Sequence, residues 1–439
     1  MKTIKIKLVA FLMISGAFLL AFSLKREEPK KTRPFVPPLG CVFRTVMGEE
    51  SSEDHFKYKT PENVLASVER GLSWIAQAQN NNGGWGAGSH QRQDLTDPHA
   101  VQTDPATTAM VAMALLRSGS TLTEGKYSKE LKNALSYLLN AVETSGNQPN
   151  NITSITGTQI QSKLGANIDV ILTSQFLSNI VETLTGGTLK ERIKKCQNIC
   201  VSKIQAAQDN NGSITGSGWA GVLQSSFANN ALEAAEAQGA DVDRAKLQRA
   251  RDYQKNNYDA KTGDVNTDMG AGIVLYSVTG SVRASAKEAR KVEEEVSKAK
   301  KEGRLANNAP PTAETLQKIG YSKDEAIRYS TAYDVYQSAK VKAQREDVMD
   351  GFGNNGGEEF LSYLQTGEAM IINKDNSWEK WYDNMSGRLL KIQNNDGSWS
   401  GHHCITSPVF CTATCLLILA VNNDVDNLTK IGAEKGAGR

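Results

Sequence analysis

The stretch RGLSWIAQAQNNNGGWG at residues 70–86 decides the fold, because the chain repeats its pattern twice more. Residues 388–401 are RLLKIQNNDGSWSG, and residues 203–219 are KIQAAQDNNGSITGSGW, in which the Trp comes later. Each copy has apolar residues at helical spacing, then a Gln, then an Asn/Gly cluster that ends the helix, since Gly and Asn tolerate the left-handed backbone of a C-cap. A second apolar helix follows each turn, at residues 107–116, 227–237 and 410–421. The unit is therefore helix, Gly-rich turn, helix, which predicts stacked helix pairs.

The Gln, Gly and Trp positions of this repeat are predicted to be structural. The Gln precedes the Gly by four residues, close enough to hydrogen-bond the turn backbone or a neighbouring repeat. The Trp follows the Gly by two residues, where a large ring can cover the junction between helices. These positions are Gln79, Gly83, Trp85, Gln208, Gly212, Gln393, Gly397 and Trp399.

The repeated phrase resembles the QW motif of the prenyltransferase and squalene-cyclase repeat. The matching positions are Arg70, Gly71, Trp74, Ile75, Gln79, Gly83 and Trp85 in one copy, and Arg388, Gln393, Gly397 and Trp399 in another. The resemblance implies an all-α fold, an α/α toroid of about six helix pairs in two concentric rings around a central cavity. Degenerate matches at residues 129–143 and 243–265 would fill the ring. The motif says little about the reaction, because this superfamily hosts several activities.

Composition and charge agree with one large helical domain. The chain has 439 residues, of which 39% are hydrophobic and 7% aromatic, and its formal net charge is +2. This near-neutral balance gives no sign of a nucleic-acid partner, which usually requires a concentrated basic face. We expect the toroid to cover residues 61–425, with a charged helical insertion at residues 283–350 that starts as an exposed, salt-bridged helix, and a polar tail at residues 426–439.

The first residues predict export. Lys2, Lys5 and Lys7 precede the uncharged apolar stretch Leu8–Leu24, which is typical of a signal peptide or an uncleaved signal anchor at residues 1–24. Residues 25–60, rich in Pro and charge, are predicted to be a flexible tether. The body is therefore expected outside the cytoplasm, either secreted or periplasmic, or anchored to a membrane by this N-terminal segment.

This chain lacks the catalytic residues that the known reactions of the superfamily require. Class II terpene cyclases, which the repeat resembles, protonate the substrate with an Asp-x-Asp-Asp cluster, and no such cluster occurs here. Asp104 opens the helix at 107–116 and is expected to be an N-cap. Protein prenyltransferase β subunits hold zinc with an Asp-x-Cys pair and a His; Cys411 stands where that His would be, but Asp268 is followed by Met269 and Gly270, with no Cys.

Reactive side chains concentrate near the C-terminal repeat. His402, His403 and Cys404 precede Cys411 and Cys415, which lie four residues apart on one helix. Three uses are open: buried or disulfide-bonded cysteines, a zinc site at His403, Cys411 and Cys415, or a cysteine nucleophile.

A second polar cluster contains Glu358 and Glu359 at the start of a predicted helix. These carboxylates would complement the helix dipole, or face the ring mouth and bind a cation or a sugar. We therefore predict a toroid that binds an unidentified ligand or protein in its central cavity. The candidate polar cluster is His402, His403, Cys404, Glu358 and Glu359. The alternative is an enzyme that acts on an isoprenoid or a glycan.

Overall fold

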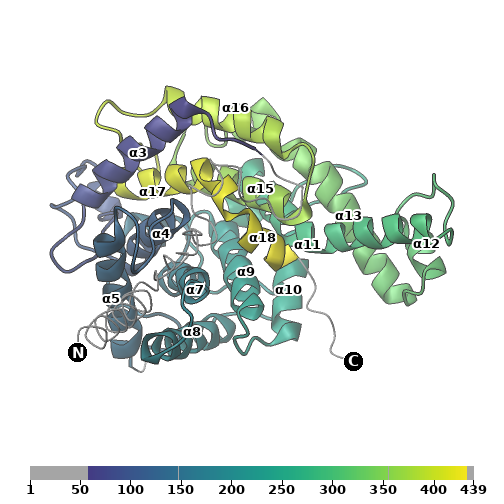
Figure 1. The fold of residues 1–439 in the computed structure, drawn as a ribbon, viewed down its shortest axis with the longest axis horizontal. Coiled ribbons are helices and arrows are strands. Elements are labelled where there is room, and N and C mark those ends of the chain that lie inside the picture. Colours follow the sequence, from purple (N-terminus) through teal and green to yellow (C-terminus); the bar gives the residue numbers. More distant parts are fainter. Residues whose placement is uncertain (1–57, 147, 354, 433–439) are drawn as a thin grey trace, which may run out of the picture. The chain divides into compact units, whose positions relative to one another are not determined.

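The computed structural model describes residues 58–146, 148–353 and 355–432, so the predicted signal segment and most of the tether lie outside the described residues. Six helices contact one another in sequence and close into a ring, because the sixth contacts the first. They are α4 (Pro105–Arg117), α7 (Ile168–Val181), α9 (Gly221–Ala237), α11 (Val274–Lys301), α15 (Gly357–Asn373) and α17 (Pro408–Leu419) (Figure 1).

An outer layer of helices surrounds this ring. Each outer helix packs against the inner helix of the preceding repeat, and α3 packs against α17 at the closure. The predicted α/α toroid is therefore confirmed. The outer helices are α3 (Glu62–Gln77), α5 (Ser128–Thr144), α8 (Thr188–Ala206), α10 (Arg244–Lys255) and α16 (Trp378–Lys391).

The sequences of the two layers explain their places. Every residue of α17 is buried, which requires a helix that is apolar or small on all sides. Outer helix α5 instead buries one stripe, formed by Leu131, Leu135, Leu138 and Val142, and exposes charged residues on its other side. Burial on all sides places a helix in the inner ring, whereas a single apolar stripe places it outside.

The motif glutamines join each turn to the next outer helix. The Gln79 side chain donates to Gly83 O and to Glu130 O of α5, both at 2.9 Å. Gln208 makes the same pair of bonds to Gly212 O and Lys246 O, at 3.4 and 3.0 Å. One side chain therefore holds its own turn and the neighbouring repeat together.

The motif tryptophans are buried between the two helices of their own pair. The indole N–H of Trp85 donates to Ile75 O at 2.8 Å, and that of Trp399 donates to Leu389 O at 2.9 Å. In the third repeat the equivalent position is Ile214, which is buried, whereas Trp219 is 40% exposed. Trp219, which the sequence suggested as a late Trp of this repeat, therefore does not occupy the motif position.

The charged insertion begins later than predicted. Residues 283–290 belong to the inner part of α11, where Arg283, Glu288 and Arg290 are buried, so the expectation of an exposed helix from residue 283 is wrong there. Beyond them, α11 packs with α12 (Ala313–Lys318) and α13 (Lys323–Ala343) around a second small core. The short α14 (Glu346–Met349) leads from this insertion back to α15.

The predicted polar tail is partly helical. Residues 426–432 lie within α18 (Val425–Gly432), which buries Val425, Leu428 and Ile431 against α15 and α11. These three apolar residues recur every three positions, but the Asp and Asn residues beside them hide this helical spacing in the sequence. In the described part of the chain, no single helix is long and apolar enough to cross a membrane; α17 with residues 421–432 meets the criterion only as a pair bent by 63°.

The remaining described elements are short and connect the helix pairs. They are α6 (Gln159–Lys163) and the 3-10 turns η1 (His90–Arg92), η2 (Asp268–Gly270) and η3 (Val421–Asp424).

Candidate functional site

The N-termini of the inner helices are joined at one end of the ring, which we call the N-terminal end. Helix N-termini carry partial positive charge, so this end favours carboxylates. The hydrogen bonds that join neighbouring repeats at this end are mostly accepted by carboxylate and amide side chains. They run from Ala106 N to Asp169 Oδ1 (3.0 Å), from Asn167 N to Gln224 Oε1 (2.9 Å), from Tyr276 Oη to Glu359 Oε1 (2.6 Å), and from Thr406 N to Gln159 Oε1 (2.8 Å).

Glu359 is buried and held as a carboxylate. Its oxygens accept hydrogen bonds from Tyr276 Oη at 2.6 Å, Gly356 N at 2.9 Å and Phe352 N at 3.1 Å, and its Oε2 lies 3.8 Å from His403 Nε2. Burial alone would raise the pKa of Glu359, but the contacts with His403, Tyr276 and Phe352 N lower it below its ordinary value. This residue is therefore ionised at neutral pH.

Glu358, the preceding residue, is also buried but accepts fewer hydrogen bonds. Its Oε2 accepts from Ile405 N at 3.3 Å, and its Oε1 has no hydrogen-bond partner. Burial and, next, the charge of Glu359 raise the pKa of Glu358 to about 7. The two neighbouring carboxyl groups thus differ in protonation near neutral pH, the condition in which one can donate a proton and the other cannot.

His403, Cys404 and Lys163 lie beside this pair. The neighbouring carboxylate of Glu359, whose Oε2 lies 3.8 Å from Nε2, raises the pKa of His403. Burial and the nearby Glu358 raise the pKa of Cys404 to about 11, so its thiol is not an activated nucleophile. Cys404 has a φ of 59°, a strained conformation for a non-glycine residue, and Gln93 Nε2 donates to its carbonyl at 2.7 Å.

Two exposed aromatic side chains complete the cluster. Trp219 is 40% and Phe352 is 52% exposed, and their ring centroids lie 5.3 Å apart. Phe352 lies 5.0 Å from the His403 ring, and Lys163 Nζ lies 5.0 Å from the Trp219 ring. Exposed large aromatic side chains beside His403 and the buried carboxylate pair make this end of the ring a candidate binding surface.

A second carboxylate pair at the same end is structural. Asp104 caps α4, accepting from Thr107 N at 2.7 Å and Ala87 N at 3.0 Å, so the predicted N-cap is confirmed. Burial and the charge of Asp169 raise the pKa of Asp104 to about 7. All four oxygens of this pair accept hydrogen bonds from the protein, in contrast to the unpartnered Oε1 of Glu358.

The cysteines show no disulfide and give no support to a zinc site. Cys196, Cys200, Cys404, Cys411 and Cys415 are all free, so the disulfide alternative is wrong for them. Burial raises the pKa of Cys411 and Cys415, and the Cys411 thiol donates to Ile405 O at 3.4 Å. Within residues 58–146, 148–353 and 355–432, no group of three or more His, Cys, Asp and Glu side chains could hold a metal ion.

The structure therefore brings together most of the cluster named from the sequence. Glu358, Glu359, His403 and Cys404 lie within reach of one another, and His402 is exposed with its ring 6.2 Å from that of His403. Tyr276, Lys163, Trp219 and Phe352 were missed. The sequence offered one signal for this group: Trp219 lies five residues after the position where the motif places its Trp.

Comparisons with known proteins concern the fold alone. No protein-family model matches the sequence, and no curated protein matches it. Among solved structures, the chain is similar to the type II terpene cyclase MstE from Scytonema in its apo form, with 13% identity, a TM-score of 0.44, and coverage of 83% of this chain and 98% of that one. An Asp-to-Ala variant of MstE in complex with its product merosterolic acid A gives 11% identity and the same TM-score and coverage.

Proposed function

We propose that the protein binds a hydroxyl-rich ligand, a glycan, at the N-terminal end of its ring. The observation that carries the proposal is the buried Glu358–Glu359 pair beside the exposed rings of Trp219 and Phe352. Sugar hydroxyls donate hydrogen bonds to carboxylate oxygens, and the apolar faces of sugar rings pack on aromatic faces. The Oε1 of Glu358 has no hydrogen-bond partner, and a hydroxyl that reaches this buried atom after a shift of the exposed Phe352 side chain would supply one.

The polar character of the inner helices supports a polar ligand over an isoprenoid. Cyclisation of isoprenoids passes through carbocations, which need aromatic faces. Several of the large buried rings serve the turns and the outer layer, as Trp85, Trp399 and Trp378 do, while Phe176, Phe360 and Phe410 are buried on the inner helices. The inner helices also bury many polar side chains with unpartnered atoms, which an apolar isoprenoid could not satisfy. They are Thr173, Ser174, Asn229, Asn230, Ser277 and Gln365.

A neighbouring pocket would lengthen the binding surface. The loop that bonds Cys404 through Gln93 also lines a pocket of about 200 Å³, together with residues 155–158. Backbone groups of Gly88, Gly157 and their neighbours border it. An oligosaccharide that extends from the carboxylate pair would find a second set of polar groups there.

A glycan array tests the proposal. The full-length protein, Trp219→Ala and Phe352→Ala are applied to the same array, with Val341→Ala as a control because Val341 is 64% exposed on the insertion helix α13. We expect the bound glycans to be lost in the two aromatic variants and retained in the control. Binding of no glycan, or equal binding by all four proteins, would contradict the proposal.

Acid catalysis on the bound glycan is a second candidate function. It is favoured by one observation: Glu358 has a pKa of about 7 while Glu359 is ionised, which is the pairing that glycoside hydrolysis uses. Incubation of each array-positive glycan with the protein, followed by measurement of new reducing ends, checks it. Hydrolysis by the wild type that Glu358→Gln abolishes even at glycan concentrations that saturate the variant supports catalysis; bound but uncleaved glycan leaves the protein a binding module.

Export remains part of the proposal. It rests on Lys2, Lys5 and Lys7 followed by Leu8–Leu24, which precede the described residues. Fractionation of cells that produce the full-length chain checks it, with recovery outside the cytoplasm expected and recovery in the cytosol contradicting it.

A further inference from the structure

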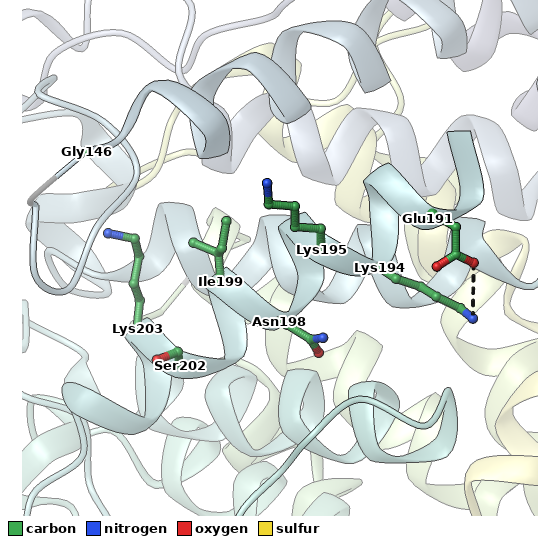
Figure 2. Close-up of a pocket in the computed structure, with 8 residues that line it drawn as sticks. All are labelled: Gly146, Glu191, Lys194, Lys195, Asn198, Ile199, Ser202 and Lys203. Carbon is green, nitrogen blue, oxygen red and sulfur yellow. Dashed lines mark ion pairs between the residues drawn. The ribbon is translucent and has the colours of Figure 1, made fainter. Parts of the chain in front are cut away.

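Helix α8 of the outer layer borders an open groove of about 760 Å³. The lining residues of α8 share one face of the helix, and Gly146 lies on the loop that follows α5 (Figure 2). They are Glu191, Lys194, Lys195, Asn198, Ile199, Ser202 and Lys203. This groove is on the outer layer, whereas Glu358 and Glu359 begin an inner helix.

The groove is rich in hydrogen-bond donors and in positive charge. Lys194 pairs weakly with Glu191, at 3.7 Å, and Lys203 donates to the carbonyl of Gln148 without a counter-charge. Among the described residues, Lys195 makes no ion pair. In Figure 2 the amines of Lys195 and Lys203 extend to the same side of α8. Both amines therefore lie on one side of α8 without an ion pair to any described residue; Lys203 is buried and bonded to the loop, and Lys195 acts through its charge on Glu143.

The length and lining of the groove fit an extended chain. Residues 191–203 span about 18 Å along a helix at 1.5 Å per residue, which is the length of about five residues of extended polypeptide. Asn198 and Ser202 offer side-chain groups that pair with a peptide backbone, and Ile199 offers an apolar contact. We propose that this groove docks an acidic, extended polypeptide segment of a partner protein.

Two other anionic partners fit less well. Glu191 lines the groove, and its carboxylate would repel a chain that carries only negative charge, such as polyphosphate, whereas backbone N–H groups of a peptide can donate to it. A membrane surface is broad and cannot enter a concave groove beside a helix. Lysine suits this loose electrostatic pairing, because its ammonium is a flexible point charge without the fixed fork of arginine.

The test measures binding of a fluorescein-labelled peptide of about ten alternating Glu and Ser residues to the full-length protein by fluorescence anisotropy. We expect saturable binding that weakens as salt rises from about 50 to about 300 mM. Lys194→Glu with Lys195→Glu is expected to weaken it by about tenfold or more, and Lys194→Gln with Lys195→Gln by about threefold, since exposed pairs contribute modestly.

The matched control is Lys298→Glu with Lys301→Glu, which makes the same change in net charge on exposed positions of α11. It is expected to bind the peptide like the wild-type protein. Equal weakening in both double variants, or absence of binding by the wild type, would overturn the proposal. Tighter binding of inorganic polyphosphate or of phosphatidylglycerol vesicles than of the peptide would overturn it too. The proposal is independent of the glycan site, so peptide binding should survive Trp219→Ala.

Discussion

At the scale of single residues, the surroundings of Glu358 and Glu359 give these two adjacent, buried carboxyl groups different charge states. Glu359 receives three hydrogen bonds and lies beside a histidine, so its charge is stabilised, whereas Glu358 receives one hydrogen bond and has a raised pKa. Side chains next to each other on one helix thus differ in charge state because of what surrounds them. The sequence shows both carboxyl groups but not their donors, since Tyr276 lies far away in the chain.

Glu358→Gln should change how stability depends on pH. The pKa of Glu358 is about 7 in the folded protein, above its ordinary 4.5, so its stabilising contribution is present below about pH 4.5 and is lost as pH rises to about 7. The Glu358→Gln variant has no group that ionises at this position, so its free energy of unfolding does not fall for this reason as pH rises. We expect it to be more stable than wild type at pH 8, by on the order of 3 kcal/mol, and similar at pH 4.5.

Urea unfolding at pH 4.5 and pH 8 measures this difference, with Glu359→Gln as the opposite case. The pKa of Glu359 is lowered, so its charge stabilises the fold above its ordinary pKa, and the Gln variant should lose stability at pH 8. If both variants change stability in the same direction at pH 8, the assignment of charge states is wrong.

At the scale of elements, the turns between helices were the most predictable feature, because their chemistry is local. Gly83, Gly212 and Gly397 all have positive φ, and the Gln four residues earlier bonds the turn. The expectation that they act as helix C-caps is wrong, because the helices end five residues earlier at Ala78, Ala207 and Ile392, which have negative φ. Element ends that depend on distant packing were not predictable. The inner part of α11 and the helix α18 have polar neighbours in sequence, and only contacts with other repeats bury them.

Gly212→Ala should destabilise the protein more than Gly263→Ala does. Both glycines have a positive φ, 95° and 77°, so both variants lose about 1 kcal/mol to backbone strain. A Cβ at residue 212 would also lie 2.2 Å from Arg249 O, while a Cβ at residue 263 meets nothing within 4 Å. We expect a total loss of about 3 kcal/mol for Gly212→Ala. Thermal unfolding of both variants measures the two losses of stability. Equal losses would mean that the turn at Gly212 can move away from α10.

At the scale of the whole molecule, the fold depends on closing the ring between its first and last repeats. The bonds between neighbouring repeats recur at the closure: Gln393 donates to Gly397 O at 2.8 Å and to Ser67 O of α3 at 3.0 Å. Ser67 Oγ donates back to Gln393 at 2.8 Å. The repeated phrase predicted stacked helix pairs, and its resemblance to the QW motif predicted that they close into a toroid. Which side chains meet at the end of the ring depends on the packing of all repeats, which the sequence does not show.

Gln393→Leu should weaken the closure. It removes the donor to two carbonyls and the acceptor for Ser67, with an expected loss of about 2 to 3 kcal/mol. Gln208→Leu is the matched variant between two consecutive repeats, where the bonds are longer and Oε1 has no partner, so about 1 kcal/mol is expected. Urea unfolding compares them, and a larger loss for Gln208→Leu would argue against a special role for the closure.

The most direct test of the central claim, a glycan site at the N-terminal end of the ring, is calorimetric titration with the strongest glycan from the array. Wild type, Phe352→Ala, Glu358→Gln and the control Ile327→Ala, whose side chain is 48% exposed on α13, are measured at pH 7. We expect Phe352→Ala and Glu358→Gln each to weaken binding by about tenfold or more, while Ile327→Ala binds as wild type does. Unchanged affinity in both site variants, with all four proteins folded, would contradict it.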